Sequence, residues 1–442
     1  MAEDIASEML TKGTQLPPHR ILAYKLGISP NTTSRAYKEA VKRALIQGEV
    51  GRGTFVRSIN ENLPVGALAD LNREVKGPID LSRNLPMPGF ADTDIKRILK
   101  DISYSGNVSA LLDYQTKDDL STHKEAGKIW LTGCGIDANT DQIIPTMGGQ
   151  HGILCALMAL LQPGDLLLTE ALTYIPVIAI AERLGLYTAT VAMDDGGVIP
   201  ESFEQLCIQA KPKAFYLTPT LQAPTTVTLS LHRRKEIAEI AEKYNVILIE
   251  DDVFAPLKRN RAVPIALLAP EHTVYITSLS KTVAPGLRVG FLYFPSRFSL
   301  ALSHTVNLSI WMTPPLTMEI AARLINDGTA KTLSIKQSAA AEERQTLARS
   351  ILTGLDFMAD PQGFHIWIPL PDQFRADHFC MECAKYGVLV NNGRCFAPNV
   401  ADAPEAIRIC LSHEVDKIRV ARGLNILAKL IQKPPSISAF EI

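Results

Sequence analysis

The pattern of apolar and polar positions changes twice along the chain, and each change predicts a boundary between structural parts. Residues 17–45 carry apolar positions at helical spacing, interrupted at Gly27, which predicts two short helices joined by a tight turn. The next stretch, "QGEVGRGTFV", places three glycines among apolar positions and predicts a two-stranded hairpin. Residues 58–79 lose this periodicity and hold prolines and glycines, as is typical of a linker. We therefore expect a small module over residues 1–57, a linker over 58–79 and a large domain over 80–442.

The two helices of the small module predict a helix-turn-helix. The prolines at positions 17 and 18 open a first helix that runs through residue 26, where Gly27 ends it in a left-handed turn. Ser29 or Asn31 then caps a second helix that reaches about residue 45. In such an arrangement the second helix enters the major groove of DNA.

Charge supports a polyanionic partner for this module. The net charge of the chain is −1, but residues 1–57 hold nine Lys and Arg against five Asp and Glu, so the rest of the chain is acidic. Short polar side chains at the start of the second helix suit base edges and phosphates: Asn31, Thr32, Thr33, Ser34 and Arg35. Arg52 lies at the tip of the hairpin. A helical pair with a solvated basic face is the structural alternative.

The large domain alternates short apolar strands with helices. The runs "DLLLTE", "AFYLTP", "VILIED" and "TVYITS" predict parallel strands of an α/β fold with a mostly parallel sheet. Ligands bind such sheets at the carboxyl ends of the strands. Tyr174, Pro219, Asp251 and Ser278 follow four of these runs, so we expect the functional site there.

The segment "SLSKTVAPGLRVG" is the most suggestive. Lys281 stands at a strand end, with hydroxyls at Ser278 and Ser280 and a guanidinium at Arg288. A lysine of this kind suits a Schiff base with an aldehyde cofactor, and hydroxyls with a guanidinium suit a phosphate.

Other segments complete this chemistry. In "TMGGQHG", Gly149 and Gln150 begin a predicted helix whose first amides can hold the same phosphate. Asp251 can pair with a pyridinium nitrogen, and Tyr174 can stack on its ring. Taken singly, each has an ordinary explanation: Lys281 as a surface ammonium, Asp251 as a helix cap, Tyr174 as a core residue.

The combination resembles two families. Residues 1–57 resemble the winged-helix domain of the GntR family, in particular its MocR-type branch, and residues 80–442 resemble the fold-type I aminotransferases found in that branch. The resemblance implies a large subdomain over about 105–325 and a small α/β subdomain over about 326–442. The family's first helix usually begins upstream of where this sequence starts, so we expect one side of the small module's core to be short.

The resemblance also implies roles for individual residues. Lys281 would form the Schiff base with pyridoxal 5′-phosphate, Asp251 would pair with the pyridine nitrogen, and Tyr174 would stack on the ring. The phosphate would be held by Gly149, Gln150, Ser278, Ser280 and Arg288, and by Tyr114 from the partner subunit of a homodimer. Arg408, in "AIRICLSHE", would bind the carboxylate of an amino acid, with an ordinary salt bridge as its alternative. Arg20, Asn31, Thr32, Thr33, Arg35 and Arg52 would contact double-stranded DNA.

Two positions depart from the enzyme pattern. The family places an asparagine where this chain has Ala223, and a tyrosine where it has Phe254; both normally bond the phenolic oxygen of the cofactor. Each such hydrogen bond is worth ~1.5–3 kcal/mol. Without them we expect a raised pKa of the Schiff base and slow turnover.

We therefore expect a transcriptional regulator that senses an amino acid, an amine or the cofactor itself. The alternatives are an active aminotransferase with a vestigial DNA-binding module and a vitamin B6 sensor without an amine ligand. The longest uncharged apolar stretch, residues 152–161, is far shorter than the ~20 residues that span a bilayer. We expect a cytoplasmic protein without membrane contact. The pair Cys380 and Cys383 lacks further ligands, so we expect neither a metal nor a disulfide site.

Overall fold

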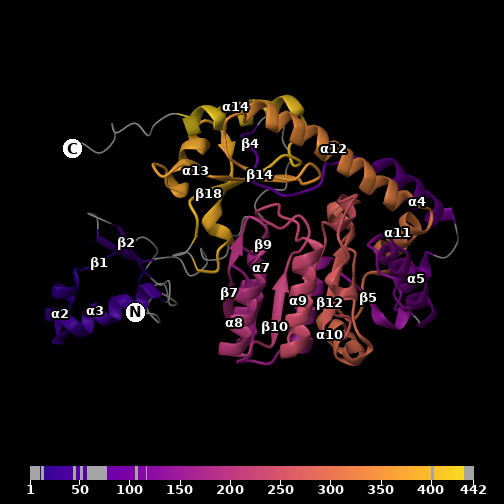
Figure 1. The fold of residues 1–442 in the computed structure, drawn as a ribbon, viewed down its shortest axis with the longest axis horizontal. Helices are drawn as coiled ribbons and strands as arrows, with labels where there is room; N and C mark the ends of the chain where they lie inside the picture. The colour runs from indigo at the N-terminus through magenta and orange to yellow at the C-terminus, as the bar shows by residue number, and fades with distance from the viewer. Residues whose placement is uncertain are drawn as a thin grey trace. The chain divides into compact units, whose positions relative to one another are not determined.

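The computed structural model describes residues 10, 14–42, 46–49, 53–56, 77–104, 108–115, 117–399 and 403–432. The chain divides into two units, Met1–Asn72 and Arg73–Ile442, and the boundary falls within the predicted linker (Figure 1). Within the described ranges, no helix combines the length and apolarity that crossing a bilayer requires.

The first unit contains the predicted helix-turn-helix and wing. Helix α2 spans His19–Leu26 and α3 spans Pro30–Lys42, and the strands are β1 (Gln15–Leu16), β2 (Ile46–Glu49) and β3 (Gly53–Val56). Gly27 ends α2 with φ at 65°, in the left-handed conformation that glycine adopts without steric cost. Ser29 caps α3, because its Oγ accepts a hydrogen bond from the amide of Thr32 at 3.1 Å.

The wing is the antiparallel pair of β2 and β3, and β1 extends it to the three-stranded order β1-β3-β2. The core of this unit is small: Leu16, Tyr37, Ala40, Ile46 and Val56 are buried together. The apolar face predicted for α2 is only partly covered, since Ala23 is buried whereas Ile21 and Leu26 are about half exposed, at 49% and 60%.

The large subdomain of the second unit is built on a seven-stranded sheet of order β5-β13-β12-β11-β10-β6-β7. Its strands are β5 (Ile143–Thr146), β6 (Leu166–Glu170), β7 (Tyr187–Val191), β10 (Ala214–Leu217), β11 (Ile247–Asp251), β12 (Thr273–Ser278) and β13 (Gly290–Tyr293). Neighbouring strands from β12 to β7 are parallel, and β13 runs antiparallel to both β12 and β5. The mostly parallel sheet expected from the sequence is confirmed.

Helices cover both faces of this sheet, because alternate residues of each strand point to opposite sides. Along β11, Ile247 and Ile249 pack in one core and Leu248 in another. The first core includes α6 (Gly149–Leu160), α7 (Ile175–Arg183) and α10 (Ser299–Ile310); the second includes α8 (Pro200–Ala210) and α9 (Leu231–Tyr244). A third core packs α4 (Asp92–Tyr104), α5 (Lys117–Gly133) and α11 (Pro315–Asn326) near β13.

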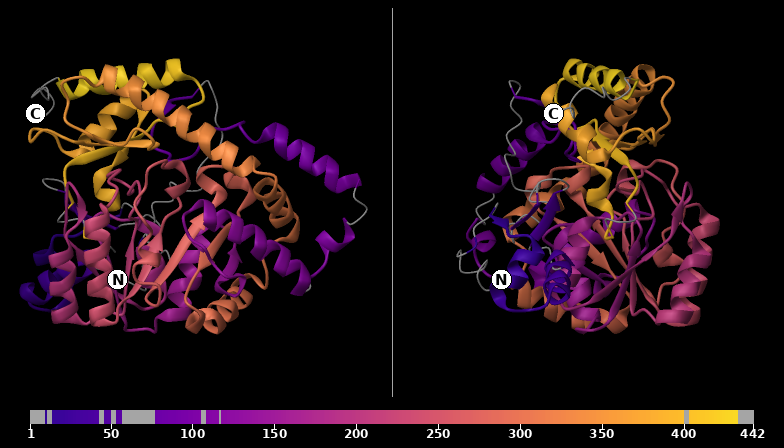
Figure 2. Two further views of the ribbon diagram at one scale, coloured as in Figure 1. Left: turned by 45° about the vertical axis from the view of Figure 1, so that its right-hand side comes forward. Right: turned by 90° about the vertical axis from the view of Figure 1, so that its left-hand side faces the viewer.

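The small subdomain follows the long helix α12, Thr329–Ile351, which Figure 2 shows in orange running between the two subdomains. Its sheet has the order β14-β15-β18-β17, and a separate parallel pair joins β16 to β4. Its remaining elements are β4 (Ile79–Asp80), β14 (Met358–Ala359), β15 (His365–Pro369), α13 (Ala376–Lys385), β16 (Val388–Leu389), β17 (Asn391–Asn392), β18 (Ala406–Cys410) and α14 (Lys417–Gln432). Short hairpin strands β8 (Met193–Asp194) and β9 (Gly197–Val198) lie in the large subdomain.

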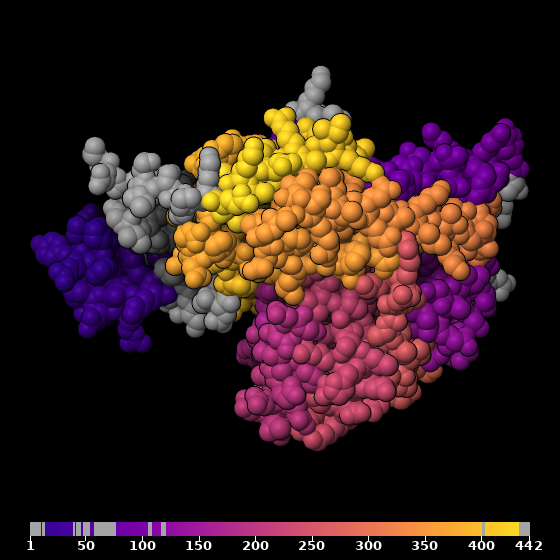
Figure 3. All heavy atoms as spheres, turned by 45° about the horizontal axis from the view of Figure 1, so that its top comes forward, coloured from indigo at the N-terminus to yellow at the C-terminus, as the bar shows by residue number. Residues whose placement is uncertain are grey.

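In the space-filling view the orange and yellow small subdomain lies against the magenta large subdomain (Figure 3). Strand β4 belongs to the small subdomain although it comes first in the sequence of this unit. The predicted linker therefore ends earlier than residue 79, because Ile79 already pairs with Val388. Cys380 and Cys383 lie on α13, and all seven cysteines of the chain are free.

Candidate functional site

A cavity of about 200 Å³ lies at the carboxyl ends of the parallel strands, where the sequence predicted the site. It is lined by Asn84, Leu85, Gly149, Gln150, Ile153, Tyr174, Thr218, Ala223, Asp251, Val253, Phe254, Ser278, Ser280, Lys281, Pro285, Arg288 and Arg408. Every residue predicted to bind the cofactor or an effector is among them except Tyr114. A larger cavity of about 950 Å³, between α5 and α12, is lined by none of these predicted residues.

Lys281 lies in the short 3₁₀ turn that follows β12. Its Nζ donates a hydrogen bond to the carbonyl oxygen of Asn84 at 2.7 Å and lies 5.0 Å from the centre of the Phe254 ring. Burial, and next the positive charge of Arg408, lower the pKa of Lys281 to about 8. Roughly a tenth of the amine is therefore neutral and nucleophilic at pH 7.

Asp251 ends β11 and is buried. Its Oδ2 accepts a hydrogen bond from the hydroxyl of Tyr216 at 2.7 Å, and burial raises its pKa to about 6, against the opposing effect of that bond. Tyr216 was not predicted as a site residue. The available signal was a tyrosine within the buried strand "AFYL", because a buried phenol needs a hydrogen-bond partner.

Several groups suited to a phosphate converge at the start of α6. Gly148 precedes this helix with φ at 78°, and a Cβ there would lie 3.0 Å from Nη2 of Arg288. The Oγ of Ser280 is buried and has no hydrogen-bond partner among the described residues. An unbonded hydroxyl in the same cavity as a guanidinium and a helix N-terminus fits an anionic group, because each can donate to its oxygens.

Tyr174 and Tyr114 differ in their surroundings. Tyr174 lines the cavity at the start of α7, where burial raises its pKa to about 12. Tyr114 is 73% exposed and contacts the Trp311 ring edge-on, with the two ring centres 6.2 Å apart. Within one chain, Tyr114 therefore does not line the cavity.

Arg408 enters the cavity from β18 of the small subdomain. Its Nη2 donates to the carbonyl oxygen of Ser82 at 2.9 Å and to Oδ1 of Asn391 at 2.8 Å, and its guanidinium lies 4.5 Å from the centre of the Phe396 ring. In the part of the chain that the structure describes, no carboxylate pairs with it. The alternative interpretation of Arg408, an ordinary salt bridge, therefore has no partner among the described residues. The guanidinium charge is available to a carboxylate.

No sequence pattern pointed to Asn84 or His365 as site residues. His365 accepts from Nδ2 of Asn84 at its Nδ1, 3.2 Å away, since its Nε2 faces the carbonyl oxygen of Gln222 at 3.1 Å and must donate there. Burial lowers the pKa of His365 to about 3, so the ring is neutral and this pattern is stable. Asn84 is 197 residues from Lys281, and only the folded chain brings them together.

Ala223 and Phe254 both line the cavity, so the two departures from the enzyme pattern lie in the site itself. Phe254 packs against Phe364 and His365 of the small subdomain, with ring centres 6.3 and 6.1 Å apart. A methyl group and a phenyl ring offer no hydrogen-bond donor to a bound ligand.

The predicted DNA-contacting residues divide by exposure. Arg20 on α2 and Asn31, Thr32 and Arg35 on α3 are exposed. Thr33 is 1% exposed, and its hydroxyl faces the carbonyl oxygen of Ser29 at 3.4 Å, so its side chain points into the core and not toward a partner. Arg52 lies outside the described residues.

The chain belongs to the aminotransferase class I and II family, which it matches over residues 77–423. Residues 1–56 match the bacterial regulatory proteins of the gntR family. The chain therefore joins a GntR-type helix-turn-helix domain to an aminotransferase-like domain, the organisation of the MocR-type regulators.

Curated relatives match this chain over most of their length. The chain is 27% identical over 433 residues to the uncharacterized HTH-type transcriptional regulator YdeF of Bacillus subtilis, covering 98% of this chain and 92% of the relative. It is 27% identical over 422 residues to the vitamin B6 salvage pathway transcriptional repressor PtsJ of Salmonella typhimurium, covering 93% and 92%. An archaeal alanine:glyoxylate aminotransferase structure shares the fold, with a TM-score of 0.74 at 23% identity, over 80% of this chain and 90% of that one.

Proposed function

We propose that this protein is a DNA-binding transcriptional regulator whose second unit binds pyridoxal 5′-phosphate at Lys281 and senses an amino acid or amine there. One observation carries the proposal. A single cavity holds a lysine with a lowered pKa, a buried carboxyl group, an unbonded hydroxyl and two guanidinium groups, in a chain that begins with a GntR-type domain.

The residues of the cavity suit this cofactor. When bound, pyridoxal 5′-phosphate supplies an aldehyde that condenses with amines and a pyridine ring that withdraws electrons. Lys281 provides the amine, and Asp251, held by Tyr216, provides a carboxylate for the ring nitrogen. Ser280, Arg288 and the first amides of α6 hold the phosphate, as do Ser278, Gly149 and Gln150, and Tyr174 stacks on the ring.

The effector binds through Arg408, whose guanidinium meets only neutral oxygens in the described part of the chain. We favour a sensor over an aminotransferase because Ala223 and Phe254 remove two donors near the cofactor. The double substitution Ala223→Asn with Phe254→Tyr tests this choice. It should raise the single-turnover rate with an amino-acid donor by at least about tenfold, since each restored bond is worth ~1.5–3 kcal/mol. A fast wild-type rate that the substitutions leave unchanged would favour the enzyme.

Sensing of the cofactor itself is the second candidate, and the printed name of one relative favours it: a vitamin B6 salvage pathway transcriptional repressor. The two candidates differ in one measurement. A screen of amino acids and amines against the cofactor-loaded protein changes its absorbance spectrum only if an amine reaches the cofactor.

We also propose a homodimer. Tyr114 and its ring partner Trp311 are both exposed, at 73% and 68%, and Leu112 and Leu308, close to them in sequence, are 75% and 70% exposed. A second copy that covers these side chains would also bring Tyr114 to its partner's phosphate site. A regulator that binds both DNA and the cofactor would act in the cytoplasm, so we also propose a cytoplasmic location.

Cofactor binding is tested by borohydride reduction of the protein with pyridoxal 5′-phosphate, followed by peptide mass mapping. The label should fall on the peptide that contains Lys281 and be absent from the Lys281→Ala variant. Lys258, a mostly buried lysine paired with Asp360, is the control and should remain unlabelled. Label elsewhere, or none, would contradict the cofactor proposal.

DNA binding is tested by gel shift with DNA from upstream of the gene at two stated salt concentrations, with and without cofactor. Binding should weaken at higher salt, because phosphate contacts release counterions. Arg35→Ala should weaken it. Binding that is absent at low salt would leave only the aminotransferase alternative.

A further inference from the structure

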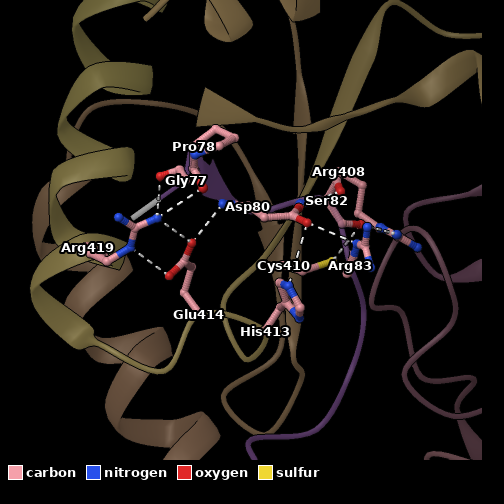
Figure 4. Close-up of polar contacts among 10 residues, drawn as sticks. All are labelled: Gly77, Pro78, Asp80, Ser82, Arg83, Arg408, Cys410, His413, Glu414 and Arg419. Atoms are coloured by element: carbon pink, nitrogen blue, oxygen red, sulfur yellow. Dashed lines mark hydrogen bonds and ion pairs between the residues drawn. The ribbon is translucent and has the colours of Figure 1, made fainter. Parts of the chain in front are cut away.

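The first described residues of the second unit form a segment whose backbone is held at both ends by the small subdomain and α12. We call residues 77–87 the connector, because they contain the last three positions of the predicted linker, residues 58–79, and the residues that follow it. At its start, Arg419 donates to the carbonyl oxygens of Gly77 and Pro78, both at 3.0 Å, while Glu414 accepts from the Asp80 amide at 2.8 Å (Figure 4).

The far end of the connector is held as firmly. Gln337 of α12 donates to the carbonyl oxygen of Met87 at 2.7 Å and accepts from its amide at 3.0 Å. Ser412 donates to the carbonyl oxygen of Leu85. The side chains that make these bonds do not line the ligand cavity, so a ligand in the cavity does not compete for them.

In the middle of the connector, Asp80 bonds Ser82 and pairs with Arg83, and Asn84 bonds His365. Two ligand-binding residues hold the same stretch through its carbonyl groups. The carbonyl oxygen of Ser82 accepts from Arg408 at 2.9 Å and from Sγ of Cys410 at 3.6 Å, and Figure 4 shows both groups beside Ser82. The carbonyl oxygen of Asn84 accepts from Nζ of Lys281 at 2.7 Å. Lys281 and Arg408, the residues expected to bind the cofactor and the effector, therefore both donate to backbone carbonyl oxygens, and these belong to residues only two positions apart.

We propose that the connector is the device that reads the cavity: ligands take Lys281 and Arg408 away from the Asn84 and Ser82 carbonyls, and the freed stretch 82–84 changes conformation. This inference rests on the proposed function and deepens it. It assigns to the backbone of residues 82–84 the role of competing with cofactor and effector for the same two cationic side chains.

Pyridoxal 5′-phosphate would act on Lys281 by condensation. The amine nitrogen of Lys281 would form a double bond to the aldehyde carbon, and the aldehyde oxygen would leave as water with the two amine hydrogens. The nitrogen would then have no hydrogen left to donate to the Asn84 carbonyl oxygen. A proton that it regained would be directed to the phenolate oxygen of the cofactor, to which neither Ala223 nor Phe254 can donate.

An amino-acid effector acts through Arg408. A carboxylate binds a guanidinium more strongly than a neutral carbonyl does, and it can accept two parallel hydrogen bonds. The Nε of Arg408 is buried and unbonded among the described residues, so the guanidinium has a donor to spare. The carboxylate therefore displaces Ser82, while an amino group that replaces Lys281 on the cofactor returns the lysine to Asn84. At Asn84 the two ligands act in opposite directions, because the cofactor removes the bond from Lys281 and the amino-acid effector restores it. At Ser82 only the effector acts.

Hydrogen exchange of the full-length protein measures the state of the connector. The amide of Ser82 donates to Oδ1 of Asp80 at 2.9 Å and that of Leu85 to the carbonyl oxygen of Arg83 at 3.1 Å, so both report opening of the middle stretch. Three probes separate the inputs: pyridoxal 5′-phosphate, pyridoxamine 5′-phosphate, and N-(5′-phosphopyridoxyl)glycine.

Pyridoxal 5′-phosphate should speed exchange in the connector about tenfold, the effect of losing one charge-assisted hydrogen bond. Pyridoxamine 5′-phosphate, which cannot condense with Lys281 and has no carboxylate, should leave exchange unchanged. The glycine adduct should speed it through Arg408 alone, and Arg408→Met should abolish that response. Equal effects of the three probes would overturn the proposal.

Variants test the connector without any ligand. Lys281→Ala should speed exchange at Ser82 and Leu85 in the ligand-free protein, and its DNA affinity should equal that of the cofactor-loaded wild type. Lys258→Ala is the matched control, because this lysine bonds Asp360 and not the connector. If Lys281→Ala exchanges like wild type, the connector proposal is wrong.

The same measurements distinguish the two proposals. Absorbance reports capture of pyridoxal 5′-phosphate independently of exchange. Capture without faster exchange would refute the connector proposal and leave the cofactor proposal standing, whereas absence of capture would refute both.

Discussion

The ionisation of Lys281 predicts how the protein captures an aldehyde cofactor as the pH changes. Burial and the charge of Arg408 lower the pKa of this lysine from 10.5 to about 8. Only the neutral amine attacks an aldehyde. At pH 7, a pKa of 8 leaves roughly a tenth of the side chain neutral, against about 0.03% for a pKa of 10.5. The pocket therefore raises the reactive fraction roughly 300-fold.

The perturbation is Arg408→Met, which removes the nearby positive charge. The pKa of Lys281 should rise, and each unit of rise lowers the neutral fraction at pH 7 about tenfold. Stopped-flow absorbance with pyridoxal 5′-phosphate between pH 6 and 10 measures the capture rate. The wild-type rate should rise with a midpoint near pH 8, and the variant's midpoint should lie higher, with the two rates converging once the lysine is neutral in both.

Arg375→Met is the matched control. This arginine has a side chain 70% exposed, pairs with Glu405 and does not line the cavity, so its removal should leave the midpoint near 8. A wild-type midpoint near 10, or an identical midpoint in Arg408→Met, would refute the reasoning.

Three further predictions follow from single contacts. Burial raises the pKa of Glu170 from 4.5 to about 8, so its contribution to stability is present below about pH 4.5 and is lost as the pH rises through 8. Glu170→Gln should remove that loss and exceed the wild-type free energy of unfolding in urea by up to about 5 kcal/mol at pH 9 but not at pH 4, whereas parallel pH profiles would contradict this. A Cβ at Gly290 would lie 2.7 Å from the carbonyl oxygen of Thr277 and 3.0 Å from the backbone of Gly148, so Gly290→Ala should cost ~1–3 kcal/mol in thermal unfolding and weaken cofactor binding, and a variant as stable as wild type would disprove the clash. Arg35→Ala should reduce the slope of log affinity for DNA against log salt by about 1, and an unchanged slope would mean that Arg35 contacts no phosphate.

Strand ends were the part of the site that could be predicted from sequence. Apolar runs such as "VILIED" mark a buried strand and its end, and parallel strands place their carboxyl ends on one edge. Asp251, Ser278 and Lys281 therefore came together as expected. The sequence left Ser29 and Asn31 as candidate caps of α3. Ser29 is the cap, because its Oγ accepts a hydrogen bond from the Thr32 amide.

Contacts that depend on tertiary approach could not be predicted. Asn84 follows a linker-like stretch without periodicity, and nothing local shows that its carbonyl meets Lys281. Thr33 was grouped with its exposed neighbours, but the rotation of α3 turns this one side chain into the core. A short polar sequence does not fix which face of a helix is buried, since the partner surface decides it.

The bonds from Lys281 and Arg408 to the connector contribute free energy that a ligand using either side chain must offset. A ligand that needs either side chain must first displace an internal acceptor, so its apparent affinity is lower than that of an equally shaped cavity with free cations. An enzyme gains nothing from this loss, because it weakens substrate and transition state alike. In a regulator the same free energy is the coupling between the ligand and the rest of the chain, and coupling of 1–3 kcal/mol is the usual size. Three features favour the same conclusion. The cavity keeps the residues that suit the cofactor, it lacks donors at Ala223 and Phe254, and its cationic side chains Lys281 and Arg408 already bond the connector. We conclude that the cavity is built to convert binding into a change at residues 82–84.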